Sequence, residues 1–383
     1  YCRVPYDAGI SERHHHSMIV SPDALGFIYP VLENGDRILE IPAGTVISSC
    51  PGDSNAHSLN AEATAEITCR SGKLYYGKNA ITWSLLGCRN KPRPHIERGI
   101  TTCGSPKRGR DYTIVWQISK NIIIPQVIIC FDEEMETPLF THHEIQGRNI
   151  DAKIIESSRP TFKKAGLCSI KVNAVYSKRN QRALLTRILG HSEHISGEGE
   201  HYLARGHLSP DSDFILEPEQ DATYYYANVL PQWQAVNNGN WKSLENSVRD
   251  LALKRRTTLE IWTGGLSTLQ LPDIRDNPVD LFLGFTENEK LIPVPALIWK
   301  VIYDPESREG IAIMQVNDVG GSGTAEDMNL YASPCEDICS QISWVDWEVN
   351  DNTSGQTFCC TVQDFRRLTA NAPNLKNARV LKS

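Results

Sequence analysis

The stretch EHYLARGHLSP at residues 200–210, followed by YANVLPQ at 226–232 and AVNNGNWKSLENSVR at 235–249, decides the fold. Its first part predicts a strand that ends in Arg205-Gly206-His207. Residues 224–230 are aromatic and β-branched, and they predict a second strand. The Asn-Asn-Gly at 237–239 is a turn or helix-start signal, and the residues that follow it predict a helix.

The predicted helix has one apolar face. Four large apolar residues recur at steps of three and four, which is the spacing of a helix with one buried side: Trp241, Leu244, Val248 and Leu251. Glu245 and Arg249 are four residues apart on the same helix, so they can pair with each other and face one site.

A strand, a strand and a helix, with a histidine on the first piece and an asparagine at the helix entry, suit a one-metal phosphodiesterase. A neutral imidazole can take a proton from water near neutral pH. A hard cation such as Mg²⁺ prefers oxygen ligands and keeps several waters, so one amide oxygen plus phosphate oxygens can form its coordination shell. Nearby arginines would neutralise the charge that develops on the phosphorus.

These residues resemble the DNA/RNA non-specific endonucleases of the ββα-metal (His-Me finger) superfamily. Arg205-Gly206-His207 is similar to the family signature Asp-Arg-Gly-His, with Ala204 where the family usually has aspartate. Asn237, thirty residues after His207, matches the metal-binding asparagine. Three further positions match family site residues: Asn228, Glu245 and Arg249. The resemblance covers roughly residues 141–383 and is strongest to secreted arthropod nucleases such as insect gut double-stranded ribonucleases.

The resemblance implies a role for each matched residue. His207 would be the general base, and Asn237 would hold Mg²⁺, for which Mn²⁺ can substitute. Arg205 and Arg249 would stabilise the phosphorane. Glu245 would orient metal-bound water or Arg249, the alternative being a simple i,i+4 salt bridge.

Two further assignments leave alternatives open. Asn228 counts as catalytic by resemblance, although a strand asparagine can also serve only to satisfy backbone groups. The family also grips phosphate with an arginine from an earlier segment; Arg182 is the preferred candidate, and Arg179 is the alternative.

Cysteine usage favours an oxidising compartment. Eleven cysteines leave at least one unpaired. We expect Cys50 to pair with Cys69 and Cys88 with Cys103, and we expect two bridges among four C-terminal cysteines: Cys335, Cys339, Cys359 and Cys360. Zinc is the alternative for this last group. The chain starts at Tyr1 with no apolar leader, so we expect a removed signal and a secreted protein, in the gut lumen or a similar extracellular space.

The formal net charge is −7, yet residues 157–192 contain no acidic residue and many basic ones. A second basic stretch spans residues 89–110. A local positive face on an acidic body suits a polyanionic substrate, and a solvated face is the alternative. No apolar run is long enough to span a membrane.

The expected architecture is α+β: an antiparallel sheet flanked by helices at 141–383, preceded by a smaller, disulfide-stapled all-β domain at 1–140. The polar stretch 136–147 is expected to bridge the two domains, and 169–176 is expected to be a strand. A zinc site built from His191, His194 and His201 is an alternative use of three histidines that precede the motif.

The sequence therefore predicts a secreted, Mg²⁺-dependent endonuclease with little sequence preference that leaves 5′-phosphate ends. The arthropod resemblance implies a preference for double-stranded RNA, with DNA and single-stranded RNA as further substrates; no membrane or protein partner is implied. The alternatives are a DNA-preferring digestive nuclease of the same fold and a catalytically dead nucleic-acid-binding protein, to which Ala204 points.

Overall fold

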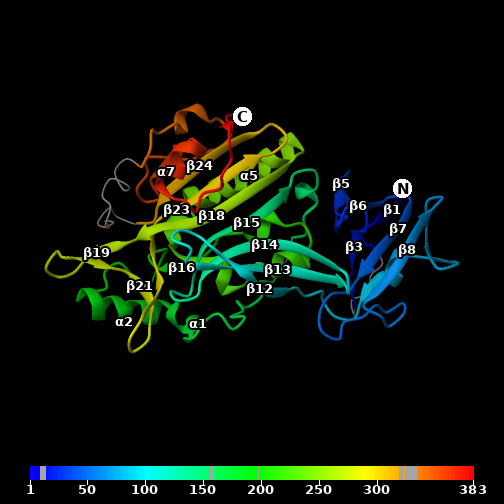
Figure 1. Cartoon of the computed structure of the whole chain (residues 1–383), viewed down its shortest axis with the longest axis horizontal. Coiled ribbons are helices and arrows are strands. Elements are labelled where there is room, and N and C mark those ends of the chain that lie inside the picture. Colours follow the sequence, from blue (N-terminus) through cyan, green and yellow to red (C-terminus); the bar gives the residue numbers. More distant parts are fainter. Residues whose placement is uncertain (9–13, 156–157, 197, 319–322, 324–333) are drawn as a thin grey trace.

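A nine-stranded, mostly antiparallel sheet forms the centre of the larger part of the molecule (Figure 1). The structure, a computed structural model, describes residues 1–8, 14–155, 158–196, 198–318, 323 and 334–383. The strand order is β12-β13-β14-β15-β18-β23-β24-β25, with β26 parallel beside β24. The strands are β12 (His95–Cys103), β13 (Gly109–Ser119), β14 (Ile122–Asp132), β15 (Thr137–Gln146), β18 (Thr258–Thr268), β23 (Pro295–Asp304), β24 (Glu309–Val316), β25 (Thr357–Cys360) and β26 (Arg379–Val380).

Alternate residues of β23 enter two different cores. Ile298 and Ile302 join the main core, which also contains Trp241 of α5 (Asn240–Arg255). Trp299 packs instead against Phe365 of α7 (Val362–Leu368), with ring centroids 5.2 Å apart. Helices therefore cover both faces of the sheet, which explains why β23 is apolar along nearly its whole length.

The sheet contains a long insertion between two adjacent strands. Gln146 at the end of β15 pairs with Thr258 at the start of β18. All of the intervening chain leaves and re-enters at this point, where the Gly147 N–H donates to the Thr257 carbonyl at 3.1 Å. The insertion contains η2 (Ile150–Ala152), α1 (Val172–Val175), α2 (Lys178–Leu189), β16 (Leu203–His207), η3 (Asp211–Asp213), α3 (Glu217–Asp221), η4 (Tyr226–Asn228), β17 (Val229–Trp233), α4 (Gln234–Asn237) and α5.

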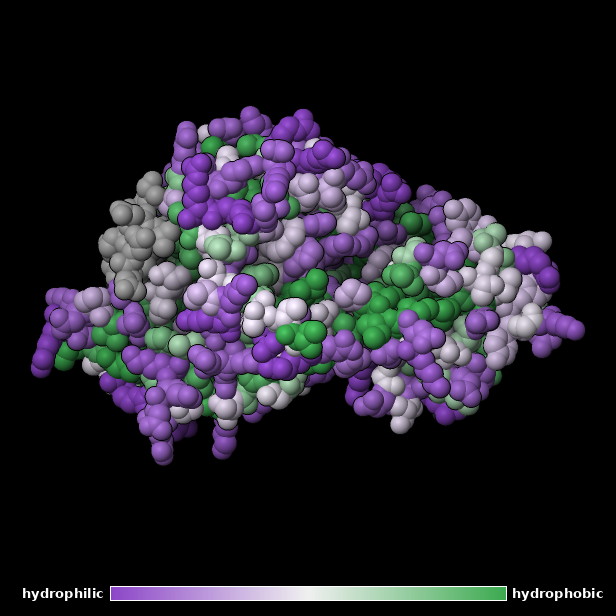
Figure 2. All heavy atoms as spheres, viewed as in Figure 1, coloured by the Kyte–Doolittle hydropathy of each residue, from purple (hydrophilic) through white to green (hydrophobic). Residues whose placement is uncertain are grey.

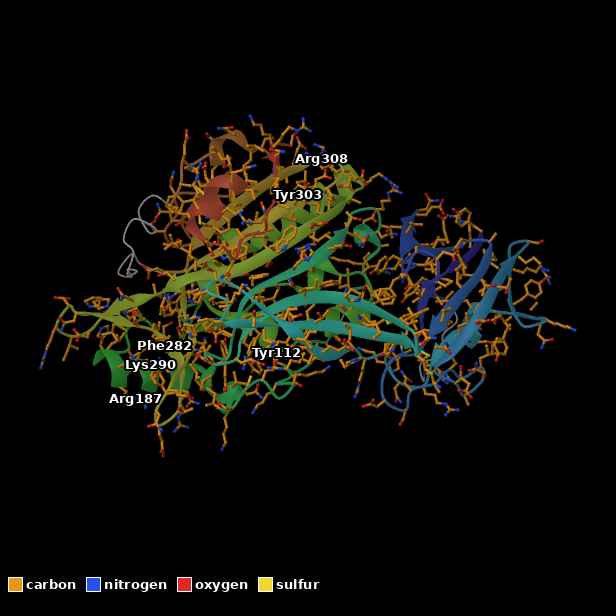
Figure 3. All side chains as sticks on the ribbon, in the orientation of Figure 1. Tyr112, Arg187, Phe282, Lys290, Tyr303 and Arg308 are labelled. Atoms are coloured by element: carbon orange, nitrogen blue, oxygen red, sulfur yellow. A yellow bond between two sulfur atoms is a disulfide. The ribbon has the colours of Figure 1, made fainter. Side chains whose placement is uncertain are left out.

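Two hairpins leave the sheet between β18 and β23. They are formed by β19 (Gln270–Pro272) with β20 (Pro278–Asp280), and by β21 (Phe282–Phe285) with β22 (Lys290–Pro293). Figure 3 shows Arg187 of α2 on the same side of the molecule as Phe282 and Lys290, and its guanidinium lies 5.0 Å from the Phe285 ring centroid. The hairpins thus pack beside α2.

The N-terminal residues form three small sheets, ordered β1-β6-β5, β10-β9-β8-β7-β3-β4 and β11-β2. Their elements are β1 (Cys2–Pro5), β2 (His15–His16), β3 (Met18–Ser21), β4 (Gly26–Phe27), β5 (Pro30–Glu33), β6 (Asp36–Ile41), β7 (Gly44–Ser49), β8 (Thr64–Arg70), β9 (Lys73–Tyr76), β10 (Asn79–Ile81), η1 (Trp83–Leu86) and β11 (Gly87–Cys88). Figure 2 shows hydrophobic side chains gathered where β13 and β14 reach these strands.

The expected boundary at residue 140 does not separate the sheets. It falls inside β15, which lies between β14 and β18 in the central sheet, so β12, β13 and β14 belong with the C-terminal strands. The stretch 136–147 is consequently a central strand and not a linker. One hydrophobic core includes both Ile19 of β3 and Ile261 of β18, which ties the N-terminal sheets to the rest. That 1–140 and 141–383 are independent units stays a prediction that the sheet topology does not favour.

Five disulfides are present among the described residues: Cys2–Cys69, Cys50–Cys88, Cys103–Cys130, Cys335–Cys360 and Cys339–Cys359. The two expected C-terminal bridges are confirmed. The expected pairs Cys50–Cys69 and Cys88–Cys103 are wrong, because Cys69 of β8 bonds Cys2 of β1, Cys50 bonds Cys88, and Cys103 bonds Cys130 of β14. Cys168 is the unpaired thiol.

Two sequence predictions about local structure are also wrong. Residues 169–176 contain the short helix α1 (Val172–Val175) and no strand, although their apolar residues alternate. The second strand of the motif starts at Val229, because Tyr226–Asn228 form a 3₁₀ turn. None of the described helices has both the length and the apolar character needed to cross a bilayer.

Candidate active site

The first motif strand pairs antiparallel with β17, with His207 opposite Val229 and Leu203 opposite Trp233. A Cβ on Gly206 would come within 2.4 Å of the Gln232 Oε1 on the neighbouring strand, so the middle position of Arg-Gly-His requires glycine. Gln181 of α2 holds the start of β16, since its side chain bonds both the N–H and the carbonyl of Leu203 at 2.8 Å. The strand that presents His207 is therefore fixed along its length.

His207 lies between two aromatic rings at the end of β16. The centroid of its ring is 5.2 Å from that of Phe162 and 4.9 Å from that of Tyr224. Its Nε2 is buried and has no hydrogen-bond partner among the described residues. Burial lowers the pKa of His207 to about 4, with the nearby positive charge of Arg159 acting in the same direction and Asp211 opposing it. The imidazole is thus a neutral group with a free ring nitrogen at physiological pH.

Arg205 is held by aromatic side chains. Its guanidinium carbon lies 5.6 Å from the Phe162 ring centroid, 5.0 Å from that of Tyr176 and 5.7 Å from that of Tyr226. Its Nε donates to the Tyr226 hydroxyl at 3.0 Å, and that hydroxyl in turn donates to Asn173 Oδ1. This cage fixes a positive charge two residues before His207 without neutralising it with a carboxylate.

Asn228 satisfies backbone groups. Its amide oxygen accepts from the Ser209 N–H at 3.0 Å, and its Nδ2 donates to the carbonyls of Ser209 and Thr223, each at 2.9 Å. The residue is fully buried, at the end of η4 and not within the second strand. These contacts favour the structural alternative, in which Asn228 fixes the chain just after His207, and its catalytic role stays a prediction.

The helix residue Arg249 pairs with Asp213 instead of Glu245. Its Nη1 donates to Asp213 Oδ1 at 2.8 Å, and the other carboxylate oxygen accepts from His143 Nε2 at 2.8 Å. Burial alone would raise the pKa of Asp213, but the hydrogen bond from His143 and the charges of Arg249 and Lys300 lower it to about 2. A buried, ionised carboxylate with both oxygens satisfied holds α5 against η3 and β15.

Glu245 makes no ion pair with Arg249 or any other described residue, so the simple i,i+4 salt bridge is not formed. Burial raises its pKa to about 7; the Lys300 ammonium lowers it, while Asp213 raises it further. Lys300 itself is buried, donates to Thr263 Oγ1 at 2.8 Å and lies 5.1 Å from the Trp241 ring centroid. Of Glu245 and Asp213, Glu245 is therefore the carboxyl group whose pKa lies closer to neutral pH.

Asn237 is the last residue of α4, just before α5 begins. Its Nδ2 donates to Gln234 Oε1 at 3.2 Å, an arrangement that turns the amide oxygen away from Gln234. Across the described part of the chain, no hydrogen bond joins Asn237 to His207, Glu245 or Arg249. The structure thus places Asn237 at the helix entry, as predicted, without linking it directly to the other site residues.

Arg179 and Arg182 both lie exposed on α2, the helix that holds β16 through Gln181. The Arg182 Nη2 donates to the Ile195 carbonyl at 3.2 Å, which directs the side chain over the loop after α2. Arg179 has no hydrogen bond or ion pair to a described residue, so its position is set only by the helix.

Sequence reasoning missed Asp213, His143, Lys300 and Phe162. Three of them have charged or polar side chains buried in or against the central sheet, where no spacing rule would have found them. The polar run Thr-His-His-Glu on β15 was the available signal, because buried polar residues on a strand need partners.

Comparison with known proteins defines the family. The model of the family described as DNA/RNA non-specific endonuclease matches residues 112–365. The chain belongs to this family. The match begins in β13, before residue 141, in agreement with the sheet topology and beyond the range over which the sequence resemblance was expected.

Relatives of this chain include salivary proteins of three species. The chain is 31% identical over 243 residues to a salivary endonuclease of Lutzomyia longipalpis, a match that covers 62% of this chain and 55% of that protein. The chain thus matches only about half the length of that relative. It is also 25% identical over 354 residues to the salivary protein Tsal1 of Glossina morsitans morsitans, covering 89% of this chain and 84% of that one. A salivary endonuclease of Culex quinquefasciatus is 24% identical over 332 residues, covering 82% and 84%.

A solved structure described as the EndoG/EndoGI complex also matches the endonuclease, at 17% identity and a TM-score of 0.33, over 50% of this chain and 72% of that one. The likeness is too slight to support a statement about this site.

Proposed function

We propose that the chain is a secreted, Mg²⁺-dependent endonuclease that hydrolyses phosphodiester bonds with little sequence preference and leaves 5′-phosphate ends. The observation that carries the proposal is the buried His207 Nε2 without a partner, next to the caged charge of Arg205. Five disulfides and the salivary names of the relatives support secretion.

His207 would act as the general base. A neutral imidazole with a free ring nitrogen can accept a proton from water as that water attacks the phosphorus. Phe162 and Tyr224 limit the movement of the ring, so the nitrogen keeps one direction. Arg205, held by its aromatic cage, would stabilise the negative charge that builds on the phosphoryl oxygens.

The residues present fit a hard divalent cation. The Asn237 amide oxygen is a suitable ligand, since Nδ2 makes the hydrogen bond to Gln234. Glu245, whose raised pKa shows that its ionised form lacks compensation, is suited to orient water on the cation. When bound, Mg²⁺ would stabilise negative charge on the phosphate and on the leaving 3′ oxygen. Arg249 is engaged with Asp213, so its contribution would be to hold α5 and Glu245 in place.

The substrate range follows from the chemistry. A water nucleophile does not use the ribose 2′-hydroxyl, so both RNA and DNA would be cleaved. We infer a preference for double-stranded RNA from the resemblance to arthropod nucleases; it would arise from groove shape and phosphate spacing.

The test is digestion of matched double-stranded RNA and DNA, with Mg²⁺ or with EDTA, followed by analysis of the product ends. We expect cleavage of both only with the metal, faster on RNA, and 5′-phosphate ends. Cyclic phosphates or EDTA-resistant cleavage would rule out the proposed chemistry. A faster reaction on DNA would favour the DNA-preferring alternative. Binding without cleavage would make this a nucleic-acid-binding protein, and Ala204 would become the residue to restore to aspartate.

A further inference from the structure

The loop between α2 and β16 brings two histidines and a glutamate together, none of which is a residue assigned to the candidate active site. His191, Glu193 and His194 each direct one ligand atom into a common space, and these atoms all lie within 4.8 Å of one another. The exposed His201 of the same loop, which the sequence grouped with the two histidines, is not part of this cluster.

The protonation of His191 is set by a backbone contact. Its Nε2 lies 3.1 Å from the carbonyl oxygen of Pro272 on β19. Because a carbonyl can only accept, Nε2 bears the hydrogen and Nδ1 keeps its lone pair. A histidine that ligates a metal generally donates its other ring N–H in this way, which fixes both tautomer and orientation.

Each histidine of the cluster has one ring nitrogen that lacks a partner. The Nδ1 of His191 and the Nε2 of His194 are buried and form no hydrogen bond with any described residue. Buried polar atoms are nearly always satisfied, so two such atoms on neighbouring histidines of one cluster require an explanation. A bound cation provides one for both.

The distances suit a transition-metal ion. Zinc binds histidine nitrogen and carboxylate oxygen at about 2.0–2.2 Å, which puts tetrahedral ligand atoms roughly 3.4 Å apart. His191 Nδ1 and Glu193 Oε1 are 3.6 Å apart. The Glu193 side chain is 78% exposed, so it can rotate to close the remaining separation.

We propose that His191, Glu193 and His194 form a Zn²⁺ site, with water as the fourth ligand. Two imidazole nitrogens with one carboxylate favour zinc over Mg²⁺, which prefers oxygen ligands only. The site is separate from the proposed catalytic cation at Asn237 and does not depend on it.

A zinc ion here would join three elements. His191 lies two residues after the end of α2 and contacts β19, while His194 precedes Ile195, whose carbonyl accepts from Arg182. The loop then leads into β16, the strand of His207. Zinc would therefore fasten the loop that connects the basic helix to the catalytic strand, which is a positioning role.

The experiment is equilibrium dialysis of the chelator-treated, disulfide-intact full chain against Zn²⁺, with bound zinc counted per chain. All variants are made on an Asn237→Ala background, so that the proposed catalytic cation does not contribute. The test variant combines His191→Gln and His194→Gln, and the matched control is His201→Gln in the same loop.

We expect the background protein and the His201→Gln control to hold one zinc per chain, and the double variant to bind at least about 100-fold more weakly. The Co²⁺-loaded background protein should show the visible absorption of a tetrahedral site, which the double variant lacks. Equal zinc binding by the background protein and the double variant would overturn the proposal, as would binding lost equally in His201→Gln. Because the readout is metal content, failure of this proposal leaves the nuclease assignment untouched.

Glu193→Gln tests the third ligand separately. The substitution keeps the size of an exposed side chain, so the fold should be unaffected. We expect zinc affinity to fall at least about 10-fold; unchanged affinity would remove Glu193 from the site.

Discussion

Two histidines, one in the central sheet and one in the insertion, differ in what their Nε2 atoms contact. His143 on β15 is 2% exposed, and its Nε2 is bonded to Asp213, which also holds Arg249. His207 on β16 is enclosed by aromatic rings, and its Nε2 is bonded to no described group. The Nδ1 of His143 is also buried without a partner among the described residues, so the two rings differ only in Nε2, which is part of an ion-pair network in His143 and is unbonded in His207. A buried network of this kind makes a core specific, so we assign His143 to the structure and His207 to the reaction.

The largest expected effect is that of His207→Ala on catalysis. Loss of a general base should lower kcat by about 10²–10⁴-fold. Stability should also fall, because removal of the ring leaves a cavity between Phe162 and Tyr224, but this loss does not by itself lower kcat in the folded fraction. Single-turnover cleavage and thermal unfolding of the same preparation measure both, with His201→Ala as the exposed control. A variant that retains wild-type kcat would remove His207 from the mechanism.

Asp213→Ala should instead lower the stability of the fold more than it lowers kcat. Removing one partner of a buried ion pair costs about 3–5 kcal/mol, because Arg249 and His143 would be left without their acceptor. Urea unfolding measures this change, and Asp250→Ala on the exposed side of α5 is the matched control. A loss no larger than that of the control would mean that the Asp213 network does not hold α5.

The pH dependence should separate the two histidines further. Since burial lowers the pKa of His207 to about 4, the base is neutral above that pH. The midpoint of the acid limb of kcat/KM should therefore lie at a pH well below the usual histidine pKa of about 6.5. A pH–rate profile at saturating Mg²⁺ measures it. A limb centred at or above that usual value would show that the ring is solvated when it acts.

The loss of stability at low pH should follow the protonation of Asp213. Its pKa in the folded protein is about 2, below the ordinary value of 3.8, so its stabilisation is present above pH 3.8 and is lost as the pH falls through about 2. Asp213→Asn should therefore remove part of the fall in stability between these two values. An unchanged acid-unfolding curve would contradict the assigned charge state.

Arg182→Ala should have the smallest effect. One phosphate contact on an exposed helix should weaken binding similarly for every sequence and reduce the salt slope of log K by about one. Binding titrations at several salt concentrations measure the slope, with Arg187→Ala on the same helix as the control. A larger change in Arg179→Ala would transfer the phosphate contact to that residue.

The sequence was most informative where chemistry and periodicity coincide. The pattern of Trp241, Leu244 and Val248 predicted the face of α5 because a helix buries residues at a fixed spacing. The β15 strand was missed because its His and Thr side chains are buried with partners that come from distant segments, as in the 2.9 Å contact between Thr141 and Ser209. Pattern rules treat such polar residues as exposed.

The same error set the expected domain boundary at residue 140. Deleting residues 1–140 would remove three strands of the central sheet and part of a fourth. Such a deletion is expected to prevent folding, so it cannot measure what the N-terminal sheets add to substrate binding. The partner of Cys69 could not be predicted from the sequence either, because Cys2 and Cys69 come together only when two sheets pack.

The pairing of β15 with β18 has a consequence for how the chain folds. Gln146 and Thr258 must meet across an insertion that contains the whole motif, and the backbone there is so close that a Cβ on Gly147 would lie 2.2 Å from the Thr257 carbonyl oxygen. Closing so long a loop delays pairing relative to the local hairpins on either side. In pulsed hydrogen exchange during refolding, β13–β14 amides should be protected before those of β18. Nuclease activity would then appear only after the two halves of the sheet have joined, late in maturation.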